Sequence, residues 1–267
     1  MSRGLAWFDA LANSSASNER SVCFADAEWG DERLRLICVV PNAKARFARA
    51  RAGQVGIEEG WTIASAVHAA IAADKGKTAR AIVALVDVPG QAFGYHEEAL
   101  GLHESLAAAA DAYASARLAG HPVIALIVGK AISGAFLAHG LQAGALIALA
   151  DDEIEVHVMS QASVARVTRR SEEEVAALAK VVPATARDVR AFAGLGAIDE
   201  LLRVENADAP TTADAQNVKS VLLRAAQRLR GGNHGPVDRL DNDEAKRARA
   251  LSIRVRQLLE AQWDASA

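Results

Sequence analysis

The chain has 267 residues, of which 51% are hydrophobic and 24% are charged, and its formal net charge at pH 7 is -3. These values are typical of a globular protein with one extended α/β domain, and the small net charge argues against nucleic acid as the main partner. Two cysteines, Cys23 and Cys38, are too few for a disulfide framework and lack metal-ligand spacing. We therefore expect both cysteines to be reduced.

Neither a secretion signal nor a membrane span is expected. The first twenty residues contain no apolar run long enough for a signal peptide, and acidic residues come early. The most apolar stretch, residues 122–150, is interrupted by Lys130, His139 and several glycines. These interruptions divide it into the lengths of a strand, a helix and a second strand, which are too short to cross a bilayer. The sequence therefore predicts a cytoplasmic protein.

Taken in chain order, the sequence predicts alternating strands and helices. Apolar, β-branched runs predict buried strands over residues 33–40, 81–90, 122–128 and 145–150. Helical spacing of apolar residues predicts helices over residues 57–74, 96–119, 133–142, 172–181, 212–229 and 243–262. A basic loop follows the first strand, and a glycine-rich loop, residues 230–236, precedes the last helix. We expect one domain over residues 1–267, with an N-terminal extension over 1–30 and a C-terminal helix within 235–267.

Two of the predicted strands end at glycine-containing turns that lead into helices. The segment DVPGQAFGYHEE includes Gly90 and Gly94, and the segment GKAISGAF includes Gly134 and Ala135. A helix N-terminus has unpaired N–H groups that stabilise negative charge, and small residues let a substrate oxygen approach the backbone. Two such donors from adjacent strand ends would form an oxyanion hole. Close packing of a helix on the sheet explains the same small residues, so the pattern fits both interpretations.

The segment from residue 121 to residue 151 resembles the central signature of the crotonase superfamily. Its features are His-Pro-Val-Ile, a strand, a glycine, a small-residue triplet and a helix before an aspartate. More narrowly, GIEEGWTIASAVHAA, VDVPGQAFGYHEE, GKAISGAFLA and GAIDELLRV resemble, in this order, segments of the carboxyltransferase subunits of acyl-CoA carboxylases. Within that group the chain is most similar to the gamma subunits of malonate decarboxylases. The resemblance implies an α/β crotonase-like spiral of ββα units, of the carboxyltransferase type.

The resemblance also implies an activity and partners. In this family a beta and a gamma subunit together decarboxylate a malonyl thioester on an acyl-carrier protein, giving the acetyl thioester and CO2. Backbone amides stabilise the resulting enolate, and by this similarity Gly134 and Ala135 match the small-residue pair and Gly90 to Gly94 match the Pro-Gly turn. The expected assembly is a hetero-oligomer. No cofactor is expected on this chain, because the CoA-like prosthetic group is carried by the acyl-carrier protein.

The sequence departs from crotonase-type hydratases at two positions. Those enzymes carry glutamates two positions after the small triplet and near the following strand end, where this chain has Leu137 and, approximately, Gln161. Without either carboxylate, hydratase acid-base chemistry is not expected. Three alternatives stay open: a carboxyltransferase subunit that passes the carboxyl group to biotin, a stand-alone acyl-CoA enzyme, and a non-catalytic scaffold subunit.

Three further residues near the strand ends, Lys130, Tyr95 and Ser160, have two interpretations each. Lys130 could bind a carboxylate or a phosphate, or it could be a turn lysine. Tyr95, followed by His96, could protonate the enolate or begin a helix. Ser160 matches a turn that faces the active site in the family, and it could equally cap a helix. His139 is predicted to be a satisfied, partly buried histidine.

Two basic stretches could receive an acidic carrier protein or the phosphates of its prosthetic arm. The first contains Lys44, Arg46, Arg49 and Arg51, and the second contains Arg166, Arg169 and Arg170. Arginine matches the geometry of phosphate with two parallel hydrogen bonds, which favours this function. Such stretches are also common on solvated surfaces. The first stretch precedes the GIEEGW segment of the resemblance, so Arg46, Arg49 and Arg51 are the predicted carrier contacts.

Overall fold

A central sheet organises the chain. The computed structural model describes residues 2–12, 20–230 and 235–264. Within these ranges the chain forms a seven-stranded sheet in the order β1-β2-β3-β4-β5-β7, with β6 paired to β4. The strands are β1 (Val22–Trp29), β2 (Glu32–Val39), β3 (Ala81–Val88), β4 (Val123–Ile132), β5 (Ala145–Leu149), β6 (Val156–His157) and β7 (Glu200–Leu202). Only the pair β1 and β2 is antiparallel among the described strands, which confirms the predicted α/β class.

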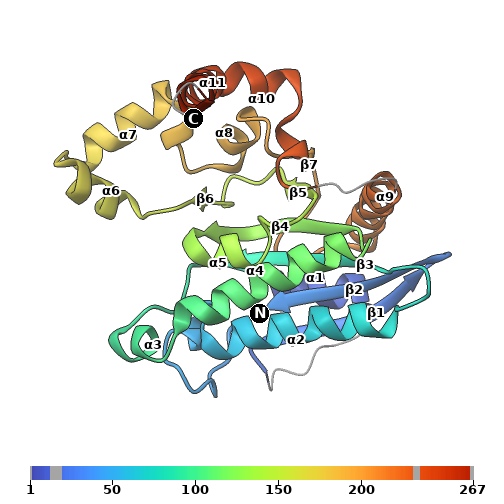
Figure 1. The fold of residues 1–267 in the computed structure, drawn as a ribbon. Helices are drawn as coiled ribbons and strands as arrows, with labels where there is room; N and C mark the ends of the chain where they lie inside the picture. The colour runs from blue at the N-terminus through green and yellow to red at the C-terminus, as the bar shows by residue number, and fades with distance from the viewer. Residues whose placement is uncertain (1, 13–19, 231–234, 265–267) are drawn as a thin grey trace.

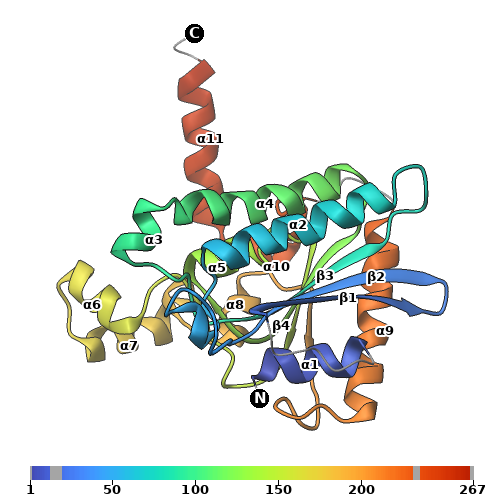
Figure 2. The ribbon, with the colours of Figure 1, turned by 90° about the horizontal axis from the view of Figure 1, so that it is seen from below.

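Helices cover both faces of the sheet (Figures 1 and 2). The helices α2 and α4 pack together on one face, and α1 and α9 lie on the other (Figure 2). A group of shorter helices lies beyond β5 and β6 (Figure 1). The helices are α1 (Arg3–Ala12), α2 (Ile57–Ala73), α3 (Tyr95–Ala99), α4 (Leu102–Leu118), α5 (Ser133–Ala138), α6 (Gln161–Thr168), α7 (Glu172–Val181), α8 (Val189–Gly194), α9 (Thr212–Leu229), α10 (Asp243–Ala248) and α11 (Ala250–Asp264).

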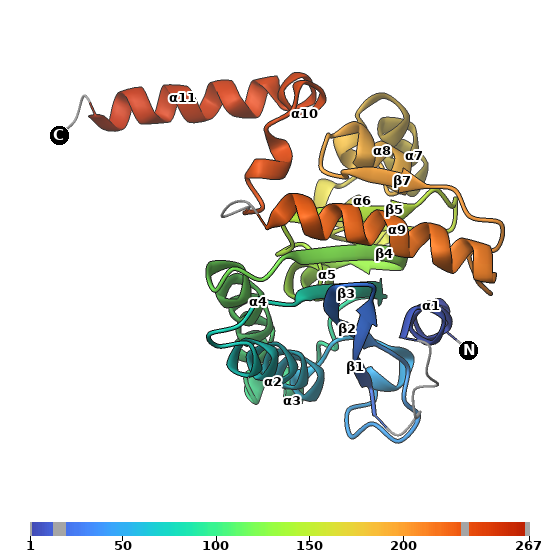
Figure 3. The ribbon, with the colours of Figure 1, turned by 90° about the vertical axis from the view of Figure 1, so that its right-hand side faces the viewer.

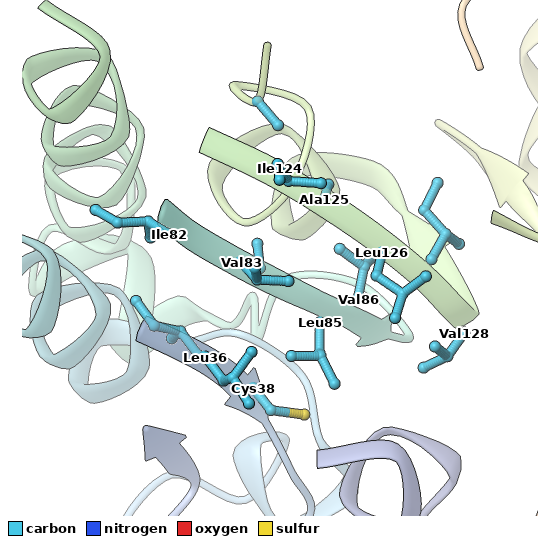
Figure 4. Packing of buried hydrophobic residues seen from close by; sticks show 14 of the residues in the cluster. Leu36, Cys38, Ile82, Val83, Leu85, Val86, Ile124, Ala125, Leu126 and Val128 are labelled. Carbon is cyan, nitrogen blue, oxygen red and sulfur yellow. The ribbon is translucent and has the colours of Figure 1, made fainter. Parts of the chain in front are cut away.

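The core lies along β3 and β4. Both strands are almost continuously apolar because helices cover them on both faces. Figure 4 shows Val83, Leu85 and Leu126 packed side by side, and these side chains are fully buried. The two strands are parallel and hydrogen-bonded to each other, so their carboxyl ends lie at the same edge of the sheet. This arrangement brings the two glycine-containing turns of the sequence together.

The N-terminal segment is part of this core. Trp7 and Phe8 on α1 are buried against the sheet, and the Trp7 indole donates a hydrogen bond of 2.8 Å to the carbonyl of Ala207. The Asp87 carboxylate on β3 accepts a hydrogen bond of 3.0 Å from the backbone N–H of Gly4. Residues 3–12 and 22–29, which the sequence assigns to an N-terminal extension, therefore form a packed helix and a paired strand.

Several predicted elements have different bounds in the structure. The helix predicted over 96–119 is divided into α3 and α4, because Gly101 adopts a φ of 86° in the left-handed region. The last predicted helix is divided at Arg249 into α10 and α11. Strand β4 continues to Ile132, so Lys130 lies within a strand and not in a turn. Helices α6 and α8 are not predicted, and residues 231–234 of the predicted glycine-rich loop lie outside the described residues.

Both cysteines are free thiols, as predicted, and both are buried. Cys23 on β1 and Cys38 on β2 are direct cross-strand partners and are not joined by a disulfide. Burial raises the pKa of the Cys38 thiol well above its usual value, which keeps it protonated. Within residues 2–12, 20–230 and 235–264, every helix is too short or too polar to traverse a lipid bilayer.

A close crossing of α2 and α4 gives a prediction about stability. A β-carbon on Gly60 would lie 2.5 Å from the carbonyl oxygen of Ser105 on the neighbouring helix. Because backbone atoms cannot move aside cheaply, we expect Gly60→Ala to lower the free energy of unfolding by about 3 kcal/mol. Gly194→Ala is the control, since nothing lies within 4 Å of that position and alanine favours the helix. Urea unfolding should separate the two variants, and equal stabilities would contradict the close crossing.

Candidate functional site

The carboxyl ends of β3 and β4 bring the two predicted turns together. Val88 and Ala131 are paired near the ends of the strands, after a register shift. The chain then continues from β3 through Pro89–Gly94 into α3, and from β4 directly into α5. Gly90 has a φ of 130°, which favours glycine, and a β-carbon there would lie 4.0 Å from the Ile132 side chain. The Gly90 to Gly94 turn and the start of α5 are therefore neighbours, as predicted.

Ser133 turns the chain from β4 into α5 within a single residue. Its φ is 58°, and among the described residues only Arg169 is a second non-glycine residue with a positive φ. A side-chain-bearing residue in this region costs roughly 1 kcal/mol or more, and such strain is concentrated at functional sites. Gly134 and Ala135 follow in the first turn of α5, where N–H groups have no partner inside the helix. The strained residue thus directs the backbone of the predicted small-residue pair.

The Gly134 amide faces a carbonyl oxygen from the neighbouring turn. Its N–H donates a hydrogen bond of 3.0 Å to Oε1 of Gln91, which lies between Gly90 and Gly94. A β-carbon on Gly134 would lie 3.3 to 3.7 Å from the three end atoms of the Gln91 carboxamide, so the carboxamide packs against a bare Cα. The sequence alone did not single out Gln91 as a partner of Gly134.

The first basic stretch lies beside the same turn. Val55 pairs with Gln91, accepting a hydrogen bond of 2.8 Å from the N–H of Ala92 and donating one of 3.0 Å to the carbonyl of Gly90. The guanidinium of Arg49 lies 4.0 Å from the ring centroid of Phe93, a cation–π distance. The structure therefore brings the loop that contains Arg46, Arg49 and Arg51 to the predicted oxyanion hole.

The other three predicted site residues lie on β4, on α3 and at the start of α6. Lys130 is exposed on β4, and its backbone N–H donates a hydrogen bond of 3.1 Å to Asp87. Tyr95 begins α3 and its side chain is 86% exposed, in edge-to-face contact with His96. Ser160 is the N-cap of α6, where its hydroxyl oxygen accepts a hydrogen bond of 3.2 Å from the N–H of Ser163.

An apolar cavity of about 370 Å³ lies beside α5. Ser133, Leu137 and Gln161 are among its lining residues, together with parts of β6, α7 and α8. By the resemblance, Leu137 and, approximately, Gln161 correspond to the hydratase glutamates, and none of the residues that line the cavity is a carboxylate. The cavity therefore lacks the pair of carboxylates that a hydratase of this type uses for acid-base chemistry.

His139 is a satisfied core residue, as predicted. Its ring lies between the Tyr113 hydroxyl, 2.9 Å from Nδ1, and the carbonyl of Leu85, 3.0 Å from Nε2. The neutral ring satisfies both groups if Nε2–H donates to the carbonyl and Nδ1 accepts from the hydroxyl. Burial lowers the pKa of His139 to about 4, so the ring is neutral at pH 7.

This buried histidine predicts how stability depends on pH. The folded-state pKa lies below the unfolded value of 6.5, so the unfolded chain binds more protons between these values and stability falls as pH decreases. Between pH 7 and pH 5 this group should lower the free energy of unfolding by about 2 kcal/mol. We expect His139→Gln, measured by urea unfolding at both pH values, to lose that much less stability on acidification than the unsubstituted chain. Equal losses would show that His139 does not contribute.

Two sequence comparisons identify the family of the chain. The family model of the malonate decarboxylase gamma subunit (MdcE) matches residues 50–263. Malonyl-S-ACP:biotin-protein carboxyltransferase (MADD) from Malonomonas rubra is 35% identical over 248 residues, spanning 90% of this chain and 83% of the relative.

Solved structures extend the similarity to the whole architecture. A chain of a Pseudomonas malonate decarboxylase hetero-tetramer in complex with coenzyme A is 49% identical with a TM-score of 0.91, covering 98% of this chain and 100% of that chain. A chain of the Pseudomonas MdcD-MdcE hetero-dimer is 48% identical with a TM-score of 0.87, covering the same shares. Transcarboxylase 12S, at 21% identity and a TM-score of 0.58, covers 78% of this chain and 36% of that chain, and shows the crotonase-type carboxyltransferase fold. The chain belongs to the family of malonate decarboxylase gamma subunits.

Proposed function

We propose that this gamma subunit stabilises the enolate formed when a malonyl thioester on an acyl-carrier protein loses CO2. The Gly134 amide, with Ala135 and the Gly90 to Gly94 turn, is the proposed donor region. The observation that carries this proposal is the hydrogen bond of 3.0 Å from Gly134 to a side-chain carbonyl oxygen, because a thioester carbonyl oxygen could occupy the same position. Strain at Ser133 and the bare Cα of Gly134 support it.

The proposed reaction needs a hydrogen-bond donor that stabilises the negative charge formed on the substrate. The bond between the malonyl carboxyl carbon and the α-carbon breaks, CO2 leaves, and the electron pair moves onto the thioester oxygen as an enolate. The α-carbon then takes up a proton, which gives the acetyl thioester. Loss of one backbone donor to such an oxygen costs about 3 to 4 kcal/mol of barrier. The overall reaction is that of a lyase, and in this chain Lys130 is the proposed carboxylate contact, with Tyr95 and Ser160 at the edge of the site.

The basic loop is the proposed contact for the carrier protein and its CoA-like prosthetic group. Arg49 is held over Phe93 next to the donor region, and Arg46 lines a cavity of about 620 Å³ with Lys44, Arg20 and Trp61. Three cationic side chains around one cavity suit the phosphates of such a group. Arg51 is partly engaged in its own loop, because its Nε–H donates a hydrogen bond of 2.9 Å to the carbonyl of Ala45.

A beta-type subunit is the proposed partner, and α11 is its proposed contact. This helix extends away from the rest of the chain (Figure 3), and the family model covers it to residue 263. Its apolar face is exposed and consists of Leu251, Val255, Leu258 and Leu259. The solved Pseudomonas relatives are a hetero-dimer and a hetero-tetramer, which supports a related subunit as the occupant of this face. The cytoplasm remains the proposed location.

Decarboxylation of a malonyl-loaded carrier protein tests the proposed function. The purified chain should be inactive alone and should release CO2 and the acetyl thioester when mixed with the beta-type subunit. Absence of turnover in a folded, assembled mixture would contradict the proposal. Equal turnover by the chain alone would instead indicate a stand-alone acyl-CoA enzyme.

One observation favours a second candidate function. The Malonomonas rubra relative is, by name, a malonyl-S-ACP:biotin-protein carboxyltransferase. Transfer to biotin uses the same backbone donors, because the carboxyl group still leaves an enolate behind. Adding a biotin carrier protein to the assay distinguishes the two, since carboxybiotin would accumulate in place of free CO2 only if this chain is a transferase subunit.

A further inference from the structure

The Gln91 side chain occupies the Gly134 N–H, one of the donors in the proposed donor region. The Gly134 N–H carries a single hydrogen, and Oε1 of Gln91 accepts it at 3.0 Å. The assignment of the carboxamide oxygen is determined by the contact, because an N–H donor requires an acceptor and the side-chain nitrogen of glutamine only donates. A substrate oxygen can therefore reach the Gly134 N–H only if this side chain moves.

The surroundings let the side chain move while the backbone stays in place. The backbone on both sides of Gln91 is held by Val55, through hydrogen bonds of 3.0 Å with Gly90 and 2.8 Å with Ala92. Among the described residues, the contact with Gly134 is the single hydrogen bond of the carboxamide, and the side chain is half-buried. The carboxamide also packs against a Cα that bears no side chain. Rotation of the side chain would therefore break one hydrogen bond and expose the donor without displacing the loop.

The hydrogen bonds of His139 are permanent structural contacts, and they differ from the hydrogen bond between Gly134 and Gln91. Its ring is fully buried and both ring nitrogens have partners. Gln142, at the other end of α5, caps the helix by donating a hydrogen bond of 3.2 Å to the carbonyl of Leu137. That contact covers a carbonyl and leaves the donor region free. Gln91 differs from both residues because it covers an N–H donor with an acceptor of the same type as the substrate oxygen.

We propose that the Gln91 side chain caps the Gly134 N–H in the empty site and is exchanged for the substrate oxygen on binding. This inference rests on the proposed function and deepens it. On binding, the hydrogen bond from Gly134 to Gln91 is replaced by one from Gly134 to the substrate oxygen. Because the bond to Gln91 must be broken first, the cap lowers the affinity for substrate by the free energy of that bond. A net hydrogen bond of this kind corresponds to roughly a two- to tenfold change in affinity. The cap also keeps water and small anions from holding the donor between turnovers.

The test is a comparison of Michaelis constants in the assembled complex with its beta-type subunit. Gln91→Met keeps the length of the side chain and removes the strong acceptor, and it should lower the KM for the malonyl-carrier protein roughly two- to tenfold. Gln91→Glu places a carboxylate on the same N–H, which binds more strongly and repels an anionic substrate, and it should raise the KM about tenfold or more. Gln142→Met is the matched control and should leave the KM unchanged.

The directions in which KM changes in the two Gln91 variants distinguish exchange with the substrate from a purely structural role of Gln91. If Gln91 only shaped the loop, both substitutions would raise the KM or lower kcat in the same direction, and that result would overturn the proposal. A KM within twofold of the unsubstituted value in both variants would overturn it as well. If the unsubstituted complex shows no turnover, the proposed function fails separately, and titration of the complex with acetyl-coenzyme A then measures the exchange as the ratio of Kd values. Opposite shifts of Kd in the two variants support the exchange, and equal Kd values contradict it.

Discussion

Replacing Gly134 with valine should lower the turnover of the assembled enzyme about 100- to 1,000-fold, the range measured when an oxyanion-hole donor is lost. A β-carbon at this position would already lie 3.3 Å from Gln91, and the branched side chain would fill the space where a substrate oxygen approaches the N–H. Gly134 has no left-handed φ, so the backbone accepts valine. Turnover of the complex under saturating malonyl-carrier protein measures the effect.

The control for this substitution is Gly194→Ala, at a helical glycine with nothing within 4 Å. Its turnover should equal that of the unsubstituted complex. The melting temperature and the assembly of both variants should be measured together with activity. Full activity of a folded, assembled Gly134→Val complex would show that the Gly134 amide is not used, and it would support the scaffold interpretation.

Introducing aspartate at both Val255 and Leu258 should prevent assembly with the beta-type subunit. Both side chains lie on the exposed apolar face of α11. An apolar anchor at the centre of an interface contributes about 2 kcal/mol or more, so two buried aspartates should weaken association at least about 100-fold. Because α11 makes few contacts with the rest of the chain, the fold should remain intact. Analytical ultracentrifugation of the mixed subunits measures the change.

The matched control is the double substitution Gln257→Asp and Arg256→Gln, which changes the net charge by the same amount on other faces of the same helix. This variant should assemble normally. If both variants assemble, α11 does not contact the beta-type subunit. If the Val255 and Leu258 variant instead changes self-association of this chain, the apolar face belongs to an interface between copies.

Much of the site could be predicted because strand ends leave a clear pattern in the sequence. The apolar runs of β3 and β4 are covered on both faces, so they are continuous and stop where the turns begin. Gly134 and Ala135 lie two and three residues after the end of β4, and Gly90 lies two residues after the end of β3. Parallel pairing then brings the two ends to one edge of the sheet. Sequence pattern and sheet geometry together therefore place the donor region.

The contact between Gln91 and Gly134 could not be predicted, because it joins residues separated by 43 positions through one side-chain rotamer. Strand β1 was also missed, since it is an edge strand in which Asp26 and Glu28 interrupt the apolar pattern. The packing of α1 depends on tertiary partners such as Asp87 and Ala207, which leave no local signal. These features all depend on contacts distant in sequence, and helix and strand periodicity carries no information about them.

Exchange of the Gly134 peptide amide for an ester tests the central claim most directly. Incorporating glycolic acid at position 134 replaces the N–H with an oxygen and leaves the shape of the site almost unchanged. An equivalent ester at Ala176, on α7, controls for the loss of a backbone hydrogen bond. If the Gly134 N–H stabilises the enolate, kcat of the assembled complex should fall about 100-fold or more while assembly is retained. A kcat within about twofold of the amide enzyme would contradict the account, because catalysis would then not use this donor.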